Sequence, residues 1–282
     1  MTEVDPAAAS VLTRDNVVVV IPALNEELRI REVVEGALAQ CAHVIVVDDG
    51  SEDGTIAAIA DLPVTLLRHA QRMGKGASLR DGFAEAMRQG LQAVVTMDGD
   101  GQHLGEDIPR LIAAANRHPH CLINGARLRK RSQQPLYRRI GNDFGDWGIS
   151  MACGFRIRDT QCGQRLYPLA LCKLGDVPGE DFVYEAQLLL SAARELGMRV
   201  VSVPIESRYK AVHSGDQFRK SHFRVFRDLY KITSHVVAQA FRYGDVPGYC
   251  RRARANPPLI DDPSGEFGTA FDQAAAQTNG WT

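Results

Sequence analysis

Asp98 and Asp100 close an apolar run, with only glycine between and after them. The stretch "AVVTMDGDGQH" (93–103) is typical of a short buried strand that gives way to a turn. On an extended strand, carboxylates at positions i and i+2 point to the same side, and glycine lets a ligand approach the backbone. Such hard oxygen ligands suit Mg²⁺ or Mn²⁺ that also contacts phosphate oxygens. A solvated turn is the alternative interpretation, because Asp and Gly are also good turn formers.

A calcium loop of the EF-hand kind is excluded by two positions. Such a loop needs glycine at its sixth position and glutamate at its twelfth. Counted from Asp98, these positions hold His103 and Pro109. The carboxylate pair therefore predicts either a magnesium- or manganese-type site or a turn.

Two further polar stretches follow apolar runs: "PALNEE" (22–27) and "VVDDGSEDGT" (46–55). In the second, Asp48 and Asp49 end a run of branched residues, where an acidic side chain is placed to accept hydrogen bonds from a base or ribose. A strand-end turn with a capped helix start is an equal alternative for both stretches, with Asn25 as the cap in the first.

Basic residues gather in "HAQRMGKGASLRDGF" (69–83). The pattern does not fit the phosphate loop G-x-x-x-x-G-K-[ST]. Lys75 and Arg72 are therefore either phosphate contacts or part of a solvated basic turn.

The elements that must position these residues alternate along the chain. The β-branched run at 17–22 is typical of a parallel strand covered on both faces. Strands are expected at 17–22, 43–49, 64–69, 93–98 and 121–127, and helices at 23–41, 51–62, 77–90 and 106–118. This order predicts an α/β fold with a mostly parallel central sheet flanked by helices. Because ligands of such sheets lie outside the carboxyl ends of the strands, the polar stretches are expected to meet there.

The second half of the chain has a different pattern. Helices are expected at 136–155 and 180–197 and a strand at 198–205, followed by a Gly- and Pro-rich tail from 244 that we expect to be largely loosely ordered. The expected organisation is an N-terminal extension (1–15), a catalytic domain (16–215), a basic amphipathic helical segment (216–243) and the partly disordered tail (244–282).

Composition limits the function classes. The 282 residues carry a formal net charge of -1, which gives no argument for nucleic acid as a partner. No run approaches the roughly 20 apolar residues of a membrane span, and the acidic N-terminus lacks a signal-peptide pattern, so a cytoplasmic location is expected. The six cysteines form no C-x-x-C pair, which argues against a zinc ribbon.

The ordered set of motifs resembles family 2 glycosyltransferases with the GT-A fold, especially the branch of dolichol-phosphate mannose synthase and its polyprenyl-phosphate relatives. The resemblance runs from about Val17 to Tyr230 and rests on "PALNEE", "VVDDGSEDGT", "GKGASLRDGF", "MDGDGQH", "NGAR", "DTQCGQRLY", "GEDFVYEAQLLL" and "VPIESRY". It implies a metal-dependent inverting enzyme that moves a sugar from a nucleotide-diphosphate sugar to a polyprenyl phosphate or another lipid-linked acceptor.

The resemblance also implies roles for individual residues. Those expected to line the base and ribose are Pro22, Leu24, Glu26, Val47 and Asp49. The metal is assigned to Asp98 and Asp100, with Asp100 the firmer ligand. The remaining expected donor-binding residues are Lys75, Gly99, Gln102, Arg127, one of Arg138 and Arg139, Asp159, Gln161 and Arg165, some of which contact the acceptor instead.

Charge builds on the departing diphosphate during such a transfer, and the metal with Arg127 would stabilise it. A hydroxyl acceptor also needs a general base. The resemblance makes Asp181 the candidate and Glu185 the second choice, while helix capping is the alternative role for Asp181. A lipid phosphate is already an anion and needs no base.

The segment 217–244 leaves its role open between two interpretations. Its aromatic residues alternate with basic ones, which is typical of a helix lying on an anionic bilayer surface. A helix that packs its apolar face on the domain is the slightly favoured alternative. This segment therefore makes an anionic membrane surface a candidate partner at the inner face of the membrane.

Two other function classes compete with sugar transfer. A nucleotidyltransferase would need a Gly-rich basic loop after the first strand, where this chain has "PALNEELRI". A nucleotide-sugar-binding protein without catalysis would not need the intact carboxylate pair or the acidic "GED" element.

Overall fold

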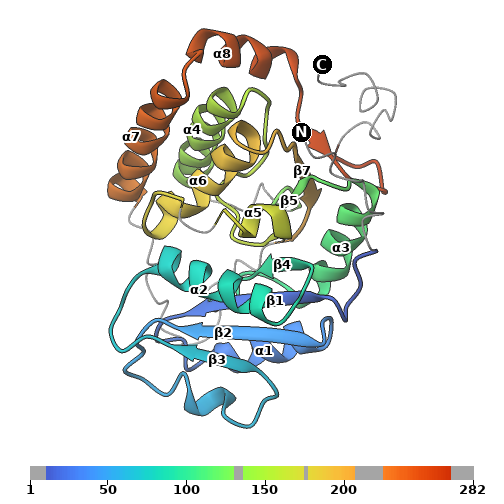
Figure 1. The fold of residues 1–282 in the computed structure, drawn as a ribbon, viewed down its shortest axis with the longest axis vertical. Helices are drawn as coiled ribbons and strands as arrows, with labels where there is room; N and C mark the ends of the chain where they lie inside the picture. Colours follow the sequence, from blue (N-terminus) through green and yellow to red (C-terminus); the bar gives the residue numbers. More distant parts are fainter. Residues whose placement is uncertain (1–10, 130–135, 175–176, 207–224, 268–282) are drawn as a thin grey trace, which may run out of the picture.

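The computed structural model describes residues 11–129, 136–174, 177–206 and 225–267. Their centre is an eight-stranded sheet with the order β3-β2-β1-β4-β6-β5-β7-β8 (Figure 1). The strands are β1 (Val17–Ala23), β2 (His43–Asp48), β3 (Thr65–Arg68), β4 (Ala93–Thr96), β5 (Leu122–Ala126), β6 (Arg165–Pro168), β7 (Val200–Pro204) and β8 (Leu259–Ile260). Among these strands only β6 runs antiparallel to its neighbours, β4 and β5. The mostly parallel sheet expected from the sequence is confirmed.

Helices cover both faces of the sheet. They are α1 (Ile30–Leu38), α2 (Lys75–Arg88), α3 (Ile108–Arg117), α4 (Leu136–Cys153), α5 (Leu169–Cys172), α6 (Asp181–Arg194), α7 (Val225–Tyr243) and α8 (Val246–Ala255), with 3-10 turns η1 (Ala57–Ile59) and η2 (Gly105–Asp107). Alternate residues of β1 face two cores: Val18 and Val20 pack under α2 and α6, and Val17 and Val19 under α1 and α3. This two-sided burial explains the unbroken apolar run in β1.

The helix expected at 51–62 is reduced to η1. Polar side chains at its start bond to backbone groups instead, and such bonds compete with helix formation. Asp53 accepts the N–H of Thr55 at 3.0 Å, and Ser51 Oγ accepts the N–H of Asn25 at 2.8 Å. Asn25 is not a helix cap: it has a φ of 55°, its side chain accepts the N–H of Glu52, and α1 begins only at Ile30.

The expectation of a largely irregular tail from 244 is wrong for residues 246–260. Asp245 caps α8 by accepting the N–H of Gly248 at 3.1 Å. Leu259 and Ile260 form β8, which pairs with β7. Asp261 then forms a bidentate ion pair with Arg117 of α3, which ties the tail to the domain.

In the described ranges no helix is both long and apolar enough to cross a lipid bilayer.

Candidate active site

The polar loops that follow β1, β2 and β4 meet at one edge of the sheet. The backbone N–H of Glu26 donates to Thr55 Oγ1 at 2.7 Å, which joins the first loop to the second. Arg29 donates to the carbonyl of Asp100 at 3.0 Å, which joins the first to the third. A side-chain carbon on Gly99 would lie 3.2 Å from the carbonyl oxygen of Pro22, so glycine permits this close approach. The sequence-based expectation that these loops converge agrees with the structure.

A chain of three charged side chains lies at this edge. The ammonium of Lys75, the first residue of α2, is 2.6 Å from Asp98 Oδ1 and 3.0 Å from Oε2 of Glu185 in α6. On its other oxygen, Asp98 lies 3.5 Å from Nε2 of the buried His103. Burial would raise the pKa of Asp98, but the charges of Lys75 and His103 outweigh it and hold that pKa below its ordinary value. Burial would likewise lower the pKa of Lys75, but Asp98 and Glu185 raise it above its ordinary value.

Asp100 has a different environment from Asp98. The strand β4 ends at Thr96, so the two carboxylates lie in a turn and not on an extended strand as expected. Asp100 accepts the backbone N–H of Gln102 at 3.0 Å and its side-chain amide at 2.8 Å. Burial and the nearby charge of Asp98 raise the pKa of Asp100. Asp98 therefore presents a carboxylate that is bound to a lysine, whereas the carboxylate of Asp100 accepts hydrogen bonds from Gln102. Both lie in the loop that follows β4.

The donor set suits a metal bound jointly with a ligand. Within the described part of the chain, no three His, Cys, Asp or Glu side chains form a ready-made metal cage. Mg²⁺ is usually held by one or two carboxylates together with waters and substrate phosphates. Asp98 and Asp100 supply that number of carboxylates, so the residues fit a metal that arrives with a diphosphate.

Asp49 is buried and fixes the loop that leads to Lys75. Its carboxylate accepts the N–H groups of Met73 at 2.7 Å and Gly74 at 2.9 Å. The same carboxylate lies 2.7 Å from Nδ1 of His69, whose other ring nitrogen lies 2.9 Å from Asp81. Burial opposes the charged form of His69, but the two carboxylates raise its pKa above the ordinary value. The structure thus places Asp49 at the expected edge in a supporting position.

Arg127 forms a bidentate ion pair with Asp159, with both side-chain contacts at 2.7 Å. Asp159 has a φ of 53°, a conformation that asparagine and aspartate adopt more readily than other residues. Its backbone N–H donates to Asp146 of α4 at 2.8 Å. Burial and the charge of Asp159 raise the pKa of Asp146 to about 6. Arg127 is therefore held in place by a carboxylate that is itself fixed to α4.

Asp181 joins the starts of two helices. Its Oδ1 accepts the N–H of Lys75 at 3.2 Å, so it binds the first turn of α2 from its own place at the start of α6. The capping role weighed from the sequence is therefore present, but it serves α2. Glu185, one turn further along α6, carries the ion pair with Lys75.

Two residues expected to bind the donor are fully buried instead. Val47 packs inside the core under α2. Arg165 donates to Asn124 Oδ1 and to the carbonyl oxygens of Thr160 and Glu185. Neither side chain is exposed to solvent in this structure. The other expected residues that the structure leaves half-buried are Pro22, Leu24, Glu26, Gln102, Arg139 and Gln161.

Several residues of the site were not expected from the sequence. His103 had served only to exclude a calcium loop, although its place directly after the carboxylates was a usable signal. His69 and Asp81 hold Asp49, and Asp146 holds the segment of Asp159. A single histidine or aspartate without a motif gives no signal of such contacts in the sequence.

Comparison with solved structures identifies the fold. A crystal structure of glucosyl-3-phosphoglycerate synthase from Mycobacterium tuberculosis with Mn²⁺ and UDP-glucose superposes with a TM-score of 0.56 at 19% identity, over 81% of this chain and 78% of that one. Mannosyl-3-phosphoglycerate synthase from Rubrobacter xylanophilus gives a TM-score of 0.59 at 16% identity, over 80% and 73%. The GT-A fold expected from the sequence is therefore confirmed.

Sequence comparison identifies the family. Residues 18–173 match the model described as "Glycosyl transferase family 2". The chain is 29% identical to the polyprenol monophosphomannose synthase of Mycolicibacterium smegmatis over 78% of this chain and 89% of the relative. It is 30% identical to the undecaprenyl-phosphate mannosyltransferase of Micrococcus luteus over 58% and 71%. The chain belongs to glycosyl transferase family 2 and is a glycosyltransferase.

Proposed function

We propose that the protein moves a sugar, with inversion, from a nucleotide-diphosphate sugar to a lipid phosphate or another lipid-linked acceptor. The observation that carries the proposal is the ion-pair chain of Asp98, Lys75 and Glu185 at the meeting point of the three loops. The names of the relatives that act on polyprenol and undecaprenyl phosphate support the acceptor class.

The donor is held by the loops after β1, β2 and β4. Half-buried Pro22, Leu24 and Glu26 lie on the first loop and would surround the base. Asp49 supports this region by fixing the loop before Lys75. Gly99 keeps the third loop against the first, which brings Asp98, Asp100 and Gln102 next to the diphosphate.

Departure of the nucleotide requires that charge on the diphosphate be stabilised. Asp98 and Asp100 would hold Mg²⁺ or Mn²⁺, which supplies a Lewis acid at the diphosphate when bound. Lys75 adds a fixed positive charge beside Asp98. Arg127 would contribute a second one, with Asp159 keeping its guanidinium in place, and half-buried Arg139 and Gln161 lie on α4 and on the loop that carries Asp159.

Acceptor activation depends on the acceptor class. A lipid phosphate is already anionic, so Asp181 then only orients the start of α2 through Lys75. For a hydroxyl acceptor, Asp181 is the proposed base, because Glu185 is engaged by the lysine ammonium.

We place the enzyme on the cytoplasmic side, at the inner face of the membrane. Helix α7 buries Ile232 and Val236 against the domain, which agrees with the packing interpretation. The same helix exposes Tyr230, Lys231 and Phe241, which suits contact with an anionic surface. Flotation with liposomes of neutral and of anionic lipid measures this contact, and binding to neither removes the membrane assignment. The residues Phe218, Arg219, Lys220, Phe223 and Arg224 lie outside the described residues.

A panel of nucleotide sugars tests the donor. Thermal shift with Mn²⁺ present should single out one donor, because a bound ligand stabilises by mass action. Asp100→Ala should abolish the Mn²⁺-dependent part of that shift and the release of free nucleotide. Metal-dependent donor turnover that survives Asp100→Ala contradicts the proposal, and donor binding without any nucleotide release in the native protein indicates a binding protein.

A further inference from the structure

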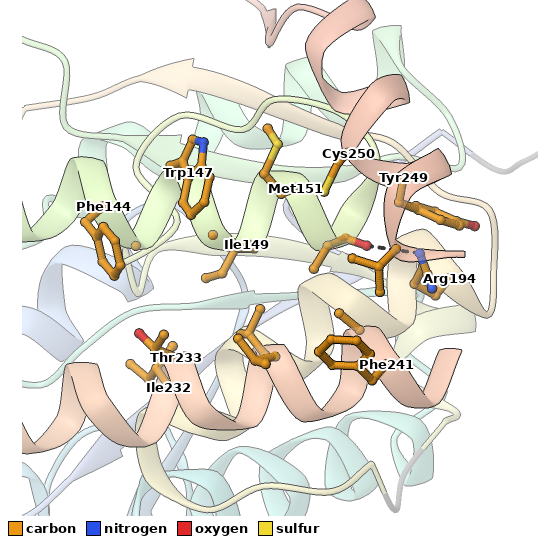
Figure 2. A pocket seen from close by; sticks show the side chains of 17 residues that line it. Phe144, Trp147, Ile149, Met151, Arg194, Ile232, Thr233, Phe241, Tyr249 and Cys250 are labelled. Atoms are coloured by element: carbon orange, nitrogen blue, oxygen red, sulfur yellow. Dashed lines mark hydrogen bonds between the residues drawn. The ribbon is translucent and has the colours of Figure 1, made fainter. Parts of the chain in front are cut away.

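An apolar groove runs between α4 and α7 and reaches α8 at one end (Figure 2). Its walls are made by Phe144, Trp147 and Met151 of α4 and by Val236, Val237 and Phe241 of α7. Several of these side chains face water: Trp147 is 56% exposed and Phe241 72%. Large exposed apolar side chains along one groove mark a binding surface.

One end of the groove lies next to the candidate active site. A side-chain carbon on Gly145, which lines the groove, would lie 3.5 Å from Nε2 of Gln161. A side-chain carbon on Gly163, two residues after Gln161, would clash with the carboxylate of Asp98. The end of the groove at Gly145 is therefore linked through the segment 161–163 to Asp98, a member of the ion-pair chain.

The other end of the groove is closed by Arg194 at the end of α6. Its guanidinium lies 3.3 Å from the ring centre of Tyr249 and 5.2 Å from that of Tyr243. It also donates to the carbonyl oxygens of Ala152 at 3.3 Å and Gly244 at 2.7 Å. Two rings and two carbonyls fix this side chain as a plug between α4, α7 and α8.

The two ends set the length of the groove. On α7 the lining residues run from Ile232 to Phe241, and the rise of an α-helix gives roughly 13 Å for this distance, about the extended length of two to three isoprene units. A ligand that fills the groove from the active site thus has a polar head at the ion-pair chain and an apolar tail of limited length.

We propose that this groove binds the first isoprene units of a lipid-phosphate acceptor and that the Arg194 plug limits the number of units that are bound. The inference rests on the proposed acceptor class. Charge and polarity select the occupant. A phosphate head would lie towards the cations Lys75 and Arg127 of the site, and the side chains that follow along the groove are mostly apolar and suit an apolar chain.

Direct binding of prenyl monophosphates tests the groove without sugar transfer. Isothermal titration with isopentenyl, geranyl, farnesyl and geranylgeranyl phosphate, each below its critical micelle concentration, measures affinity against chain length. We expect affinity to rise about tenfold or more per unit up to geranyl or farnesyl phosphate, because each buried methylene contributes. Beyond that length the affinity should change by less than about threefold per added unit, because the later units extend past the end of the groove and bury no further surface. A continued rise, or no dependence on length, overturns the inference.

Gly148 offers a variant that fills the groove. A side-chain carbon at this position meets nothing within 4 Å, so the first carbon of Gly148→Leu is accommodated, and the rest of the side chain occupies groove volume. Gly141 lies in the same helix, also meets nothing within 4 Å and does not line the groove, which makes Gly141→Leu the matched control. We expect Gly148→Leu to lower the affinity for farnesyl phosphate by about tenfold or more, and Gly141→Leu to leave this affinity unchanged. Equal affinities of the two variants overturn the inference.

Opening the plug should extend the length preference. In Tyr249→Ala the guanidinium loses its nearest ring, and geranylgeranyl phosphate should then bind better than farnesyl phosphate; an unchanged length profile in a folded variant contradicts the plug. If Gly148→Leu alters only the monomer–dimer equilibrium, or only vesicle binding, the groove serves a second copy or the bilayer and the inference is wrong.

Failure of the groove and failure of the proposed function give different results. If sugar transfer to lipid phosphate occurs but is insensitive to Gly148→Leu, the groove inference fails and the proposed function stands. If prenyl phosphates bind in the groove but no donor sugar is transferred to any of them, the proposed transfer to a lipid phosphate fails and the groove inference stands.

Discussion

The ammonium of Lys75 lies between the carboxylates of Asp98 and Glu185, which come from two segments far apart in the sequence. Lys75 begins α2, Asp98 follows β4 and Glu185 lies in α6, so the ion-pair chain joins the first half of the fold to the second half. A lysine at this point neutralises the two neighbouring acids, and in the proposed function it would also offer a positive charge to a diphosphate.

Replacing Lys75 with methionine should destabilise the protein and increase its response to divalent metal. The change leaves two partly buried carboxylates without their cation, which costs about 3 kcal/mol of unfolding free energy. Because Mn²⁺ can then neutralise the pair, Mn²⁺ alone should raise the melting temperature more in Lys75→Met than in the native protein. Differential scanning fluorimetry with and without Mn²⁺ measures both effects. An equal metal response in the two proteins would contradict the neutralising role.

Asp49→Asn should loosen the loop that leads to Lys75. The N–H groups of Met73 and Gly74 donate to different oxygens of Asp49, and asparagine replaces one of these oxygens with an NH₂ group that cannot accept. One buried N–H therefore loses its acceptor, which costs about 1–3 kcal/mol of unfolding free energy. Chemical denaturation measures this loss. Asp61→Asn is the control, since Asp61 pairs with Arg31 at the exposed surface and its loss should have little effect. Similar losses in both variants would show that Asp49 does not fix the loop.

The stability contribution of His69 should depend on pH. Its pKa in the folded protein is raised above the ordinary 6.5, so the folded state binds the proton more tightly than the unfolded one. The contribution is fully present below about pH 6.5 and is lost as the pH rises through the folded pKa. The difference in melting temperature between the native protein and His69→Asn should therefore be largest at about pH 6 and smallest at about pH 9. A difference that is constant over this range would falsify the assignment of a charged His69.

Arg165→Met should lower stability rather than donor affinity. The buried guanidinium donates to Asn124 Oδ1 and to the carbonyls of Thr160 and Glu185, and each buried acceptor left without a donor costs about 1–3 kcal/mol. Urea denaturation measures the stability, and titration of the nucleotide-sugar donor well below the melting temperature measures its affinity. A large loss of affinity in a fully folded variant would instead support the sequence-based expectation that Arg165 contacts the donor.

The sequence was informative wherever a general rule links pattern to position. Branched runs followed by polar turns predict parallel strands, and the rule that ligands lie at their carboxyl ends correctly brought the loops of Glu26, Asp49 and Asp98 together. The same pattern placed Asp98 and Asp100 on one side of a strand, which is wrong because β4 ends before them. Strand length is set by the neighbouring strands and is not encoded in the run itself.

Long-range partners were beyond the reach of sequence reasoning. The sequence around Lys75 is equally compatible with a phosphate contact and with a solvated turn. The residues that decide its environment, Asp98 and Glu185, are far away in the chain. The tail from 244 looked irregular by composition, but β8 gains its hydrogen bonds from β7 and its anchor from Arg117. Tertiary contacts thus overrode local composition.

The antiparallel strand β6 has a consequence for how the site forms. It lies between β4 and β5, and its register pairs Ala93 with Pro168. The strands β1 to β4 can pair with one another early in synthesis, but the two halves of the sheet join only after the chain has passed β6. Long-range pairing of this kind is slow because loop closure must come first. We therefore expect the edge that unites Asp98 with Glu185 to be completed late in folding, so that a partly folded chain has the loops after β1, β2 and β4 without the facing helix α6.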